Sequence, residues 1–282
     1  MPLHEVRGVL LENPGSFETR TALTAAMLAD RSDAPVSVLR CATQDLEALA
    51  AGAPAAGADG GLAQQLRAGL VLPVGSVGFL RAAMRVAGAP EPTNMSYPTA
   101  LRQHLHRCVQ QRAALDVSGR CFVKPLSTKV FTGFVFDETK ARSDYPEDVQ
   151  ADLAAFELLR QQDPTSAVWT SEPVSFQCEW RYYIQGGRIL GAARYDLDGD
   201  EGAPPPERRV VEEAVAEMAR AGVDHSFALD FGVLAEPAPA RTALIEANDA
   251  WAIGLYGRAL TPAQFLGFLW ERWLSIRDVA LS

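Results

Sequence analysis

The sequence is poor in cysteine, histidine and basic residues, and it has no long apolar run. Its 282 residues include four cysteines and four histidines, and 26 basic residues face 35 acidic ones, for a net charge of −9. Nucleic acids and anionic membranes attract clusters of Lys and Arg, so this balance argues against both as partners. None of the apolar runs approaches the about 20 residues that span a membrane, so we expect no membrane-embedded part.

The cysteines also lack the spacing of a metal or redox site. They are Cys41, Cys108, Cys121 and Cys178, which lie far apart and include no C-x-x-C pair. The N-terminus lacks the order of basic, apolar and small residues that marks a signal peptide. We therefore expect a cytoplasmic protein whose cysteines are reduced core residues.

The scarcity of lysine is more informative. Only three of the 26 basic residues are lysines, and all three lie in one short segment, as Lys124, Lys129 and Lys140. Lysine supplies a compact point charge where arginine supplies a planar fork, so the segment is expected to form a pocket that needs an ammonium group. The alternative is that the lysines cluster by chance. Lys140, the last of the three, is expected to be solvated.

The N-terminal third has the pattern of a small α/β unit. Its expected elements are strands at 6–12, 36–40 and 70–74 and a helix at 18–30. A further helix is predicted from Pro98 to Arg112, because the apolar residues there recur with helical spacing. His104 and His106 lie off that apolar stripe and are expected to be solvated.

Two of the lysines belong to a predicted hairpin. Its strands are expected at 121–125 and 133–136, with Lys124 on the same face as Phe122. The loop between them carries hydroxyl groups and an ammonium group, from Ser127, Thr128, Lys129 and Thr132. These groups suit a flap that closes over phosphates. The alternative is a surface hairpin with two exposed lysines.

The stretch Glu172-Pro173-Val174 follows Val168-Trp169-Thr170-Ser171, at a point where the chain can pass from one subdomain to another. Such a connection can read adenine with one backbone carbonyl and one backbone N–H. Because Pro173 has no N–H, Glu172 is the expected acceptor and Val174 the expected donor.

Gly186-Gly187 predicts a tight two-residue turn between two strands. The register that follows places Glu179 opposite Arg194, on the face that also carries Arg181. Two guanidinium groups beside one carboxylate suit a transferring phosphoryl group or an acyl phosphate. The alternative is an ordinary cross-strand salt bridge, which is worth little if it is exposed.

The stretch from Thr242 to Trp251 carries oxygen-bearing side chains near its end. Strand alternation puts Leu244, Glu246 and Asn248 on one face. The preceding predicted strand carries Asp230 and can lie beside it. Carboxylate and carboxamide oxygens are ligands that Mg²⁺ accepts, usually together with substrate phosphates. The alternative is a set of solvated residues at the end of a strand.

These motifs follow one another as F-V-K-P at 122–125, E-W-R at 179–181, Arg194, L-D-F-G at 229–232 and L-I-E-A-N-D at 244–249. In order and spacing they resemble the ATP-grasp superfamily, from about residue 95 to 282. The chain is most similar to ATP-grasp domains of the Arg-to-Lys clade, and more distantly to ribosomal-protein glutamate ligases. It departs from the family in its flap, where S-T-K-V-F-T-G replaces the usual glycine-rich turn.

The resemblance implies an α/β (α+β) fold of the ATP-grasp type. We expect a small N-terminal α/β domain at 1–95, followed by two α+β subdomains at 96–171 and 172–282 that enclose the nucleotide. The implied cofactors are ATP and Mg²⁺. For the nucleotide, the implied contacts are Lys124, Lys129, Thr132, Glu172, Val174 and Glu179. For the transferring phosphoryl group they are Arg181 and Arg194, and for Mg²⁺ they are Asp230, Glu246 and Asn248.

The activity that the resemblance implies is an ATP-dependent carboxylate–amine ligase. Such an enzyme forms an amide or peptide bond through an acyl phosphate and releases ADP and phosphate. The expected partners are a small-molecule carboxylate and an amine, with amino acids and peptides as the leading classes. Two alternatives stay open, a phosphotransferase on the same fold and a nucleotide-binding regulatory module without turnover. The substrates and the oligomeric state also stay open, a homodimer being one alternative.

Overall fold

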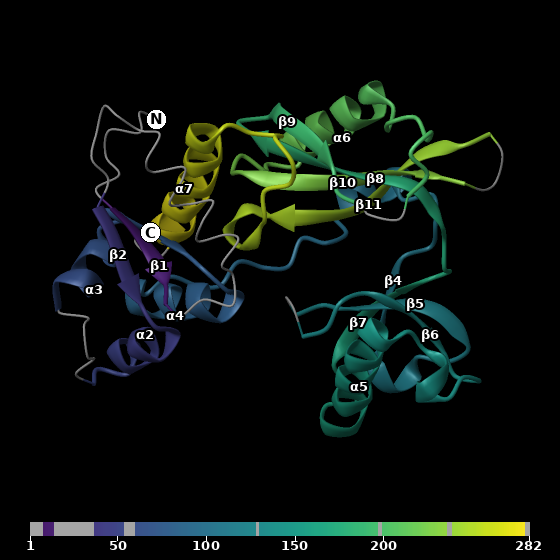
Figure 1. Cartoon of the computed structure of the whole chain (residues 1–282), viewed down its shortest axis with the longest axis horizontal. Coiled ribbons are helices and arrows are strands. Elements are labelled where there is room, and N and C mark those ends of the chain that lie inside the picture. Colours follow the sequence, from purple (N-terminus) through teal and green to yellow (C-terminus); the bar gives the residue numbers. More distant parts are fainter. Residues whose placement is uncertain are drawn as a thin grey trace.

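A computed structural model describes residues 8–13, 37–53, 60–127, 130–196, 199–235 and 239–279 of the chain. These residues form a mixed fold of helices and three sheets, which follow one another along the sequence (Figure 1). The predicted α/β (α+β) class is therefore confirmed. None of the described helices has the length and apolarity needed to cross a bilayer.

The first sheet is parallel and lies in the N-terminal part of the chain. Its strands are β1 (Gly8–Glu12), β2 (Ser37–Cys41) and β3 (Val71–Val74), in the order β2-β1-β3. All three predicted strands are present, whereas the predicted helix at 18–30 lies outside the described residues. The helices of this region are α2 (Thr43–Ala50), α3 (Gly60–Arg67) and α4 (Val77–Ala87).

The last helix of the chain, α7 (Pro262–Val279), packs against this first sheet. Its buried residues Phe268, Trp273 and Ile276 share a core with Leu10 and Phe79 from the N-terminal part. Figure 1 shows α7 between the first sheet and the third. Packing thus joins residues that the predicted boundaries separate, and the division into 1–95, 96–171 and 172–282 stays a prediction.

The second sheet is antiparallel and carries the predicted lysine hairpin. Its strands are β4 (Gln110–Ala113), β5 (Arg120–Pro125), β6 (Phe134–Asp137) and β7 (Ala167–Ser171), in the order β4-β7-β5-β6. The helix α5 (Glu147–Gln162) covers one face, because Leu153 and Phe156 pack on Val123 and Phe134. The helix α5 does not cover the other face of this sheet.

The third sheet is also antiparallel. Its strands are β8 (Phe176–Gln185), β9 (Arg188–Arg194), β10 (Phe227–Leu234) and β11 (Arg241–Asp249), in the order β11-β10-β8-β9. The helix α6 (Arg208–Arg220) buries Val211 and Met218 against Leu229 and Phe231 on one face. Alternation sends the remaining side chains of these strands to the opposite face, where the charged residues gather.

The predicted helix from Pro98 to Arg112 is wrong in its length and its end. Only a short 3-10 helix forms, η2 (Thr99–His104), and the chain turns at His106 with a φ of 49° before it enters β4. The pairing of β4 with β7 requires extended backbone there, which outweighs the helical spacing of the apolar residues. His104 is also buried rather than solvated, with Nε2 2.8 Å from Oε2 of Glu217 on α6.

The four cysteines are free thiols, but they are not all in the core. Cys41 and Cys178 are buried, Cys121 is half-buried, and Cys108 is exposed. The prediction is therefore wrong for Cys108, which lies where the chain runs on toward β4 instead of continuing a helix.

Candidate active site

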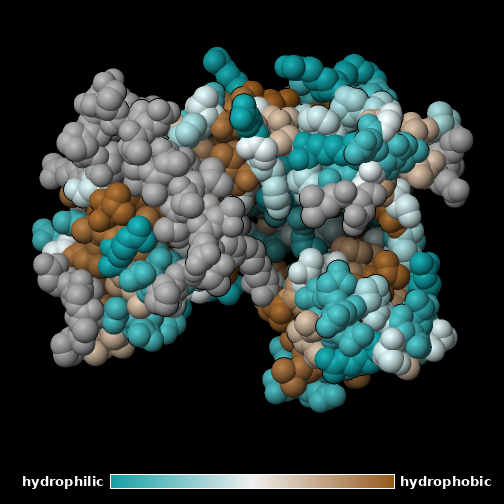
Figure 2. All heavy atoms as spheres, in the orientation of Figure 1, coloured by the Kyte–Doolittle hydropathy of each residue, from teal (hydrophilic) through white to brown (hydrophobic). Residues whose placement is uncertain are grey.

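A cleft of about 950 Å³ lies between the second and third sheets. Figure 2 shows the molecule hollowed at this place, with hydrophilic side chains in the recess. The predicted site residues that line it are Lys124, Thr132, Glu172, Val174, Glu179, Arg181, Glu246 and Asn248. The structure thus collects on one cleft residues from β5, the flap, the β7–β8 connection, β8 and β11.

A bulge in β11 places Glu246, one of the predicted metal ligands, in the cleft. Asp230 pairs with Glu246, but the next residue of β10, Phe231, pairs with Leu244, so Ile245 is an extra residue in β11. Leu244 is fully buried in the core under α6, while Glu246 lies in the cleft. The prediction that Leu244 shares the face of Glu246 is therefore wrong, because a bulge reverses the alternation. Glu246 and Asn248 do share a face, as predicted.

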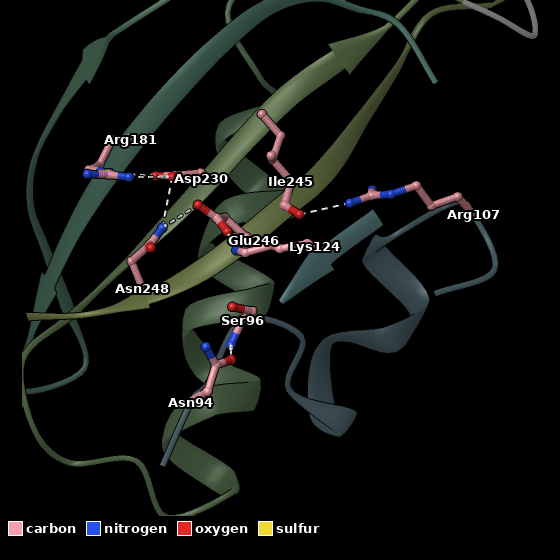
Figure 3. A network of polar contacts seen from close by, with 9 residues as sticks. All are labelled: Asn94, Ser96, Arg107, Lys124, Arg181, Asp230, Ile245, Glu246 and Asn248. Atoms are coloured by element: carbon pink, nitrogen blue, oxygen red, sulfur yellow. Dashed lines mark hydrogen bonds and ion pairs between the residues drawn. The ribbon is translucent and has the colours of Figure 1, made fainter. Parts of the chain in front are cut away.

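An ion network links the three strands at the floor of the cleft (Figure 3). Arg181 donates from Nε to Asp230 Oδ1 at 2.7 Å and from Nη2 to Asp230 Oδ2 at 2.6 Å. Asn248 Nδ2 donates to Asp230 Oδ2 at 2.9 Å and to Glu246 Oε1 at 3.1 Å. Burial alone would lower the pKa of Arg181, but the paired carboxylate of Asp230 raises it. The guanidinium therefore stays charged.

Lys124 reaches this network from the opposite side of the cleft. Its Nζ forms an ion pair with Oε2 of Glu246 and lies 5.6 Å from the centre of the Tyr97 ring. Burial, helped by the positive charges of Arg181 and Arg107 and opposed by Asp230, lowers the pKa of Lys124 to about 8. The prediction that Lys124 shares a face with Phe122 agrees with the lining of the cleft, which includes both.

The structure does not bring Arg194 to the cleft. A second register shift, between Tyr183 and Ile184, places Arg194 opposite Trp180 instead of Glu179. Its guanidinium binds Asp196, with Nε to Oδ1 at 2.8 Å and Nη2 to Oδ2 at 2.7 Å. The predicted convergence of two arginines is therefore wrong, because one extra residue in the pairing turns Arg194 to the other face.

Two tyrosines occupy the place expected for that second arginine, and sequence reasoning missed both. Tyr195 and Tyr256 stack with ring centres 5.1 Å apart, and the Arg181 guanidinium lies 5.5 Å and 5.0 Å from these rings. Burial raises the pKa of Glu179 despite a hydrogen bond from Tyr195. The shifted register explains the position of Tyr195, which is the residue after Arg194. Tyr256 comes from a loop after β11, and no sequence pattern indicates that it belongs to the site.

The predicted adenine connection joins β7 to β8 and lines the cleft from 171 to 174. The Glu172 carboxylate accepts the backbone N–H of Cys108, at 2.9 and 3.0 Å from its two oxygens. The Glu172 carbonyl accepts the Ser171 hydroxyl at 3.0 Å, which leaves one of its two lone pairs for a ligand.

The predicted flap is described only in part. Thr132 lines the cleft, and its N–H donates to Oδ1 of Asp152 on α5 at 2.9 Å. Thr128 and Lys129 lie outside the described residues. Lys140 is exposed, as expected, and its Nζ lies 5.7 Å from the centre of the Tyr145 ring.

Glu246 and Asn248 offer the cleft oxygen atoms that suit a hard divalent cation, whereas Asp230, the third predicted ligand, lies fully buried behind them and does not line the cleft. Asp230, Glu246 and Asn248 are linked by hydrogen bonds, and Asn248 uses its amide nitrogen for them, so its carbonyl oxygen stays available as a ligand. The described residues contain no group of three or more His, Cys, Asp or Glu side chains that would form a self-sufficient metal site. Two carboxylates and one carboxamide match Mg²⁺, which commonly completes its ligand set with substrate phosphates.

The arrangement of the fold and cleft agrees with a match to a known family. Residues 104–266 match the model of the ATP-grasp domain of the Arg-to-Lys clade, family 2, so the chain belongs to this family. The resemblance seen in the sequence motifs is thereby confirmed. At the level of the family, membership indicates an ATP-dependent ligase. No curated protein matches the sequence.

Solved structures share the fold at low sequence identity. D-alanine–D-alanine ligase from Bacillus anthracis is similar with a TM-score of 0.50 and 14% identity, over 97% of this chain and 96% of that one. The ADP complex of PurK, N5-carboxyaminoimidazole ribonucleotide synthetase, is similar with a TM-score of 0.52 and 10% identity, over 94% of this chain and 77% of that one. At such identities the likeness shows a common fold.

Proposed function

We propose that the protein is an ATP-dependent carboxylate–amine ligase that forms an amide bond through an acyl phosphate. The observation that carries the proposal is the ion network of Arg181, Asp230, Glu246 and Asn248 at the floor of a cleft that also holds Lys124. The cleft volume of about 950 Å³ lies within the range of about 300–1,000 Å³ found for ligand sites. The cleft therefore has room for a nucleotide.

In this proposal the nucleotide lies along the cleft from the β7–β8 connection to the ion network. The Glu172 carbonyl and the Val174 N–H would bind the adenine edge, and Lys124 with the flap residue Thr132 would bind the phosphates. Lys124 is suited to this role because it is a compact cation on the cleft side of β5. The similar synthetase structure that contains ADP supports a nucleotide in a cleft of this fold.

Asp230, Glu246 and Asn248 would hold Mg²⁺ at the terminal phosphates. When bound, the ion supplies positive charge that neutralises the phosphate oxygens. Arg181 cannot act as a base at neutral pH, so its role is to stabilise negative charge on the transferring phosphoryl group. The paired Asp230 and the rings of Tyr195 and Tyr256 hold its guanidinium in one orientation.

The reaction proposed for these residues proceeds in two steps. A carboxylate oxygen attacks the γ-phosphorus of ATP, the bond to the β-phosphate oxygen breaks, and ADP leaves. An amine then attacks the acyl carbon, phosphate leaves, and the amine loses a proton to the surroundings. The position of Arg181 beside the metal ligands supports attack at the terminal phosphate rather than at the α-phosphate, because the charge that stabilises the transition state lies there.

The test is a product analysis with ATP, Mg²⁺ and mixtures of carboxylic acids with amino acids or peptides. ADP and phosphate released in step with an amide, and a hydroxamate formed when hydroxylamine replaces the amine, would support the proposal. ADP with a phosphorylated acceptor would favour the phosphotransferase alternative. AMP as the main product would overturn the acyl-phosphate route, and nucleotide binding without any turnover would favour the regulatory module.

A further inference from the structure

The bulge in β11 leaves backbone groups at the edge of the third sheet that need partners. β11 is the outer strand of that sheet, so its outward carbonyls have no neighbouring strand to bind. A single side chain, Arg107, binds the two carbonyls at the bulge. Its Nη1 donates to Leu244 O at 2.7 Å and its Nη2 donates to Ile245 O at 2.8 Å. Figure 3 shows the contact to Ile245 beside Glu246.

The bulge decides where Glu246 points. Leu244 and Ala247 both lie in the core under α6, although residues three apart in a regular strand face opposite sides. Removing the extra residue from the pairing would put Glu246 on the face of Leu244, inside that core. The bulge instead places Glu246 in the cleft, where it contacts Lys124 and Asn248. Bulges often redirect side chains in this way at active sites.

Arg107 is itself held in one orientation. Its Nη1 also donates to Leu105 O at 3.1 Å, and its guanidinium lies 5.8 Å from the centres of both the Tyr97 and Phe176 rings. A second contact holds the same edge on the other side of Glu246, where the Ala247 N–H donates to Ser96 O at 2.9 Å. The backbone around Glu246 is thus fixed from both directions by the segment that leads into the second sheet.

We propose that Arg107 is a positioning residue for the metal site, which acts by holding the β11 bulge so that Glu246 faces the cleft. The inference rests on the proposed function, because it assumes that Glu246 is a Mg²⁺ ligand. Arg107 touches the backbone at 244 and 245 and not the proposed ligands themselves. The guanidinium places a separate nitrogen on each of the two adjacent carbonyls in a fixed planar geometry, which a single lysine ammonium does not reproduce. Arg107 also lines the cleft, and direct binding of the nucleotide is the competing role.

The experiment measures metal binding rather than turnover. Mn²⁺ replaces Mg²⁺, and its binding is followed by electron paramagnetic resonance, with and without a saturating non-hydrolysable ATP analogue. The variants are Arg107→Lys, which keeps the charge and loses the fork, and Arg107→Gln, which keeps a donor for one carbonyl. Arg102→Lys is the matched control, because Arg102 is an exposed arginine of the preceding η2 helix. Thermal unfolding shows whether each variant is folded.

With the analogue present, we expect Arg107→Lys to weaken Mn²⁺ binding by about 10–100-fold, as is typical of residues that orient metal ligands. The Mn²⁺ affinity of Arg107→Gln should lie between those of Arg107→Lys and the parent. If the lysine variant does not fold, Arg107→Gln alone provides the test. Binding of the analogue without metal should stay close to that of the parent. On a Glu246→Gln background the Arg107 substitutions should have little further effect, because both act on one ligand.

Three results would contradict these expectations, and each points to a different error. Unchanged Mn²⁺ binding in both Arg107 variants would overturn the positioning role. If the variants lose metal-free binding of the analogue by as large a factor as they lose Mn²⁺ binding, the positioning role is overturned in favour of direct contact between Arg107 and the nucleotide. If the parent itself binds no Mn²⁺ in the presence of the analogue, the proposed metal site is wrong, and any role of Arg107 toward that site is wrong with it.

Discussion

The two sheets that face the cleft supply their polar groups in different ways. The third sheet contributes groups that are buried and bound to one another, since Asp230 is fully buried and Arg181 is 8% exposed. The second sheet contributes half-buried Lys124 and a loop in which Ser127 and Thr132 are exposed. Both sets line or underlie the same cleft, but the hydrogen bonds among Arg181, Asp230, Asn248 and Glu246 all lie within the third sheet, whereas Lys124 is held by an ion pair across the cleft.

This contrast shows how one cleft can combine a rigid side with an adaptable one. Buried charges must be paired, so removing one partner of the third-sheet network disturbs the fold as well as the chemistry. Exposed hydroxyl groups on the flap lose little when a ligand replaces water, so they can adjust to phosphates. We therefore expect substitutions in the third sheet to have larger effects than those in the second.

The largest effect is expected for Asp230→Ala, which leaves the Arg181 guanidinium buried without its counter-charge. We expect the free energy of unfolding to fall by about 3–5 kcal/mol, measured by urea denaturation. The control is Asp152→Ala on the opposite side of the cleft, where one hydrogen bond from the Thr132 N–H is lost, at about 1 kcal/mol. Equal losses would remove the distinction between the two sheets.

The second prediction separates the two arginines that the sequence placed together. Arg181→Lys should reduce the rate of ADP release by about 10²–10³, because a charge-stabilising fork is lost from the cleft. Arg194→Lys should keep a rate close to that of the parent, since Arg194 binds Asp196 away from the cleft. A large loss in Arg194→Lys with Arg181→Lys unaffected would contradict a register of β8 and β9 in which Arg194 lies opposite Trp180.

Most of the strands, and several of the residues that line the cleft, were predictable from patterns in the sequence. Alternation placed Glu246 and Asn248 on one face, and the Gly186-Gly187 turn correctly joined β8 to β9. The scarcity of lysine singles out Lys124 by composition alone. The first two signals depend on neighbouring residues and the third on composition, so none of them requires tertiary information.

The two bulges were not predictable from local patterns, and each lies where distant parts of the chain make contact. The one at Ile245 is held by Arg107, and the one after Tyr183 lies where the Tyr183 hydroxyl binds the backbone of Gly254 and Tyr256. A single extra residue in each pair reversed the alternation that followed. This is why Leu244 was predicted on the wrong face and Arg194 in the wrong place.

The third prediction concerns the pH dependence of Lys124. Burial lowers its pKa to about 8 from the ordinary 10.5, so the neutral amine accumulates above about pH 8. Bound phosphates favour the ammonium, so ATP affinity should fall by up to about tenfold for each pH unit above that pKa. Titration calorimetry at pH 7 and pH 9 measures the loss. Lys124→Arg is the control, because its guanidinium stays charged and its affinity should not fall over this window.

The smallest effect is expected at the connection between the two sheets, where Glu172 meets Cys108. In our proposal adenine is bound by the backbone of Glu172 and Val174, so the Glu172 side chain serves only to accept the Cys108 N–H. Glu172→Gln keeps an oxygen acceptor there, and it should change the stability by at most about 1 kcal/mol and leave the preference for ATP over GTP intact. Competition binding with the two nucleotides measures that preference. Loss of ATP binding in Glu172→Gln would mean that the carboxylate contacts the nucleotide, and it would place the adenine edge away from the backbone of 172–174.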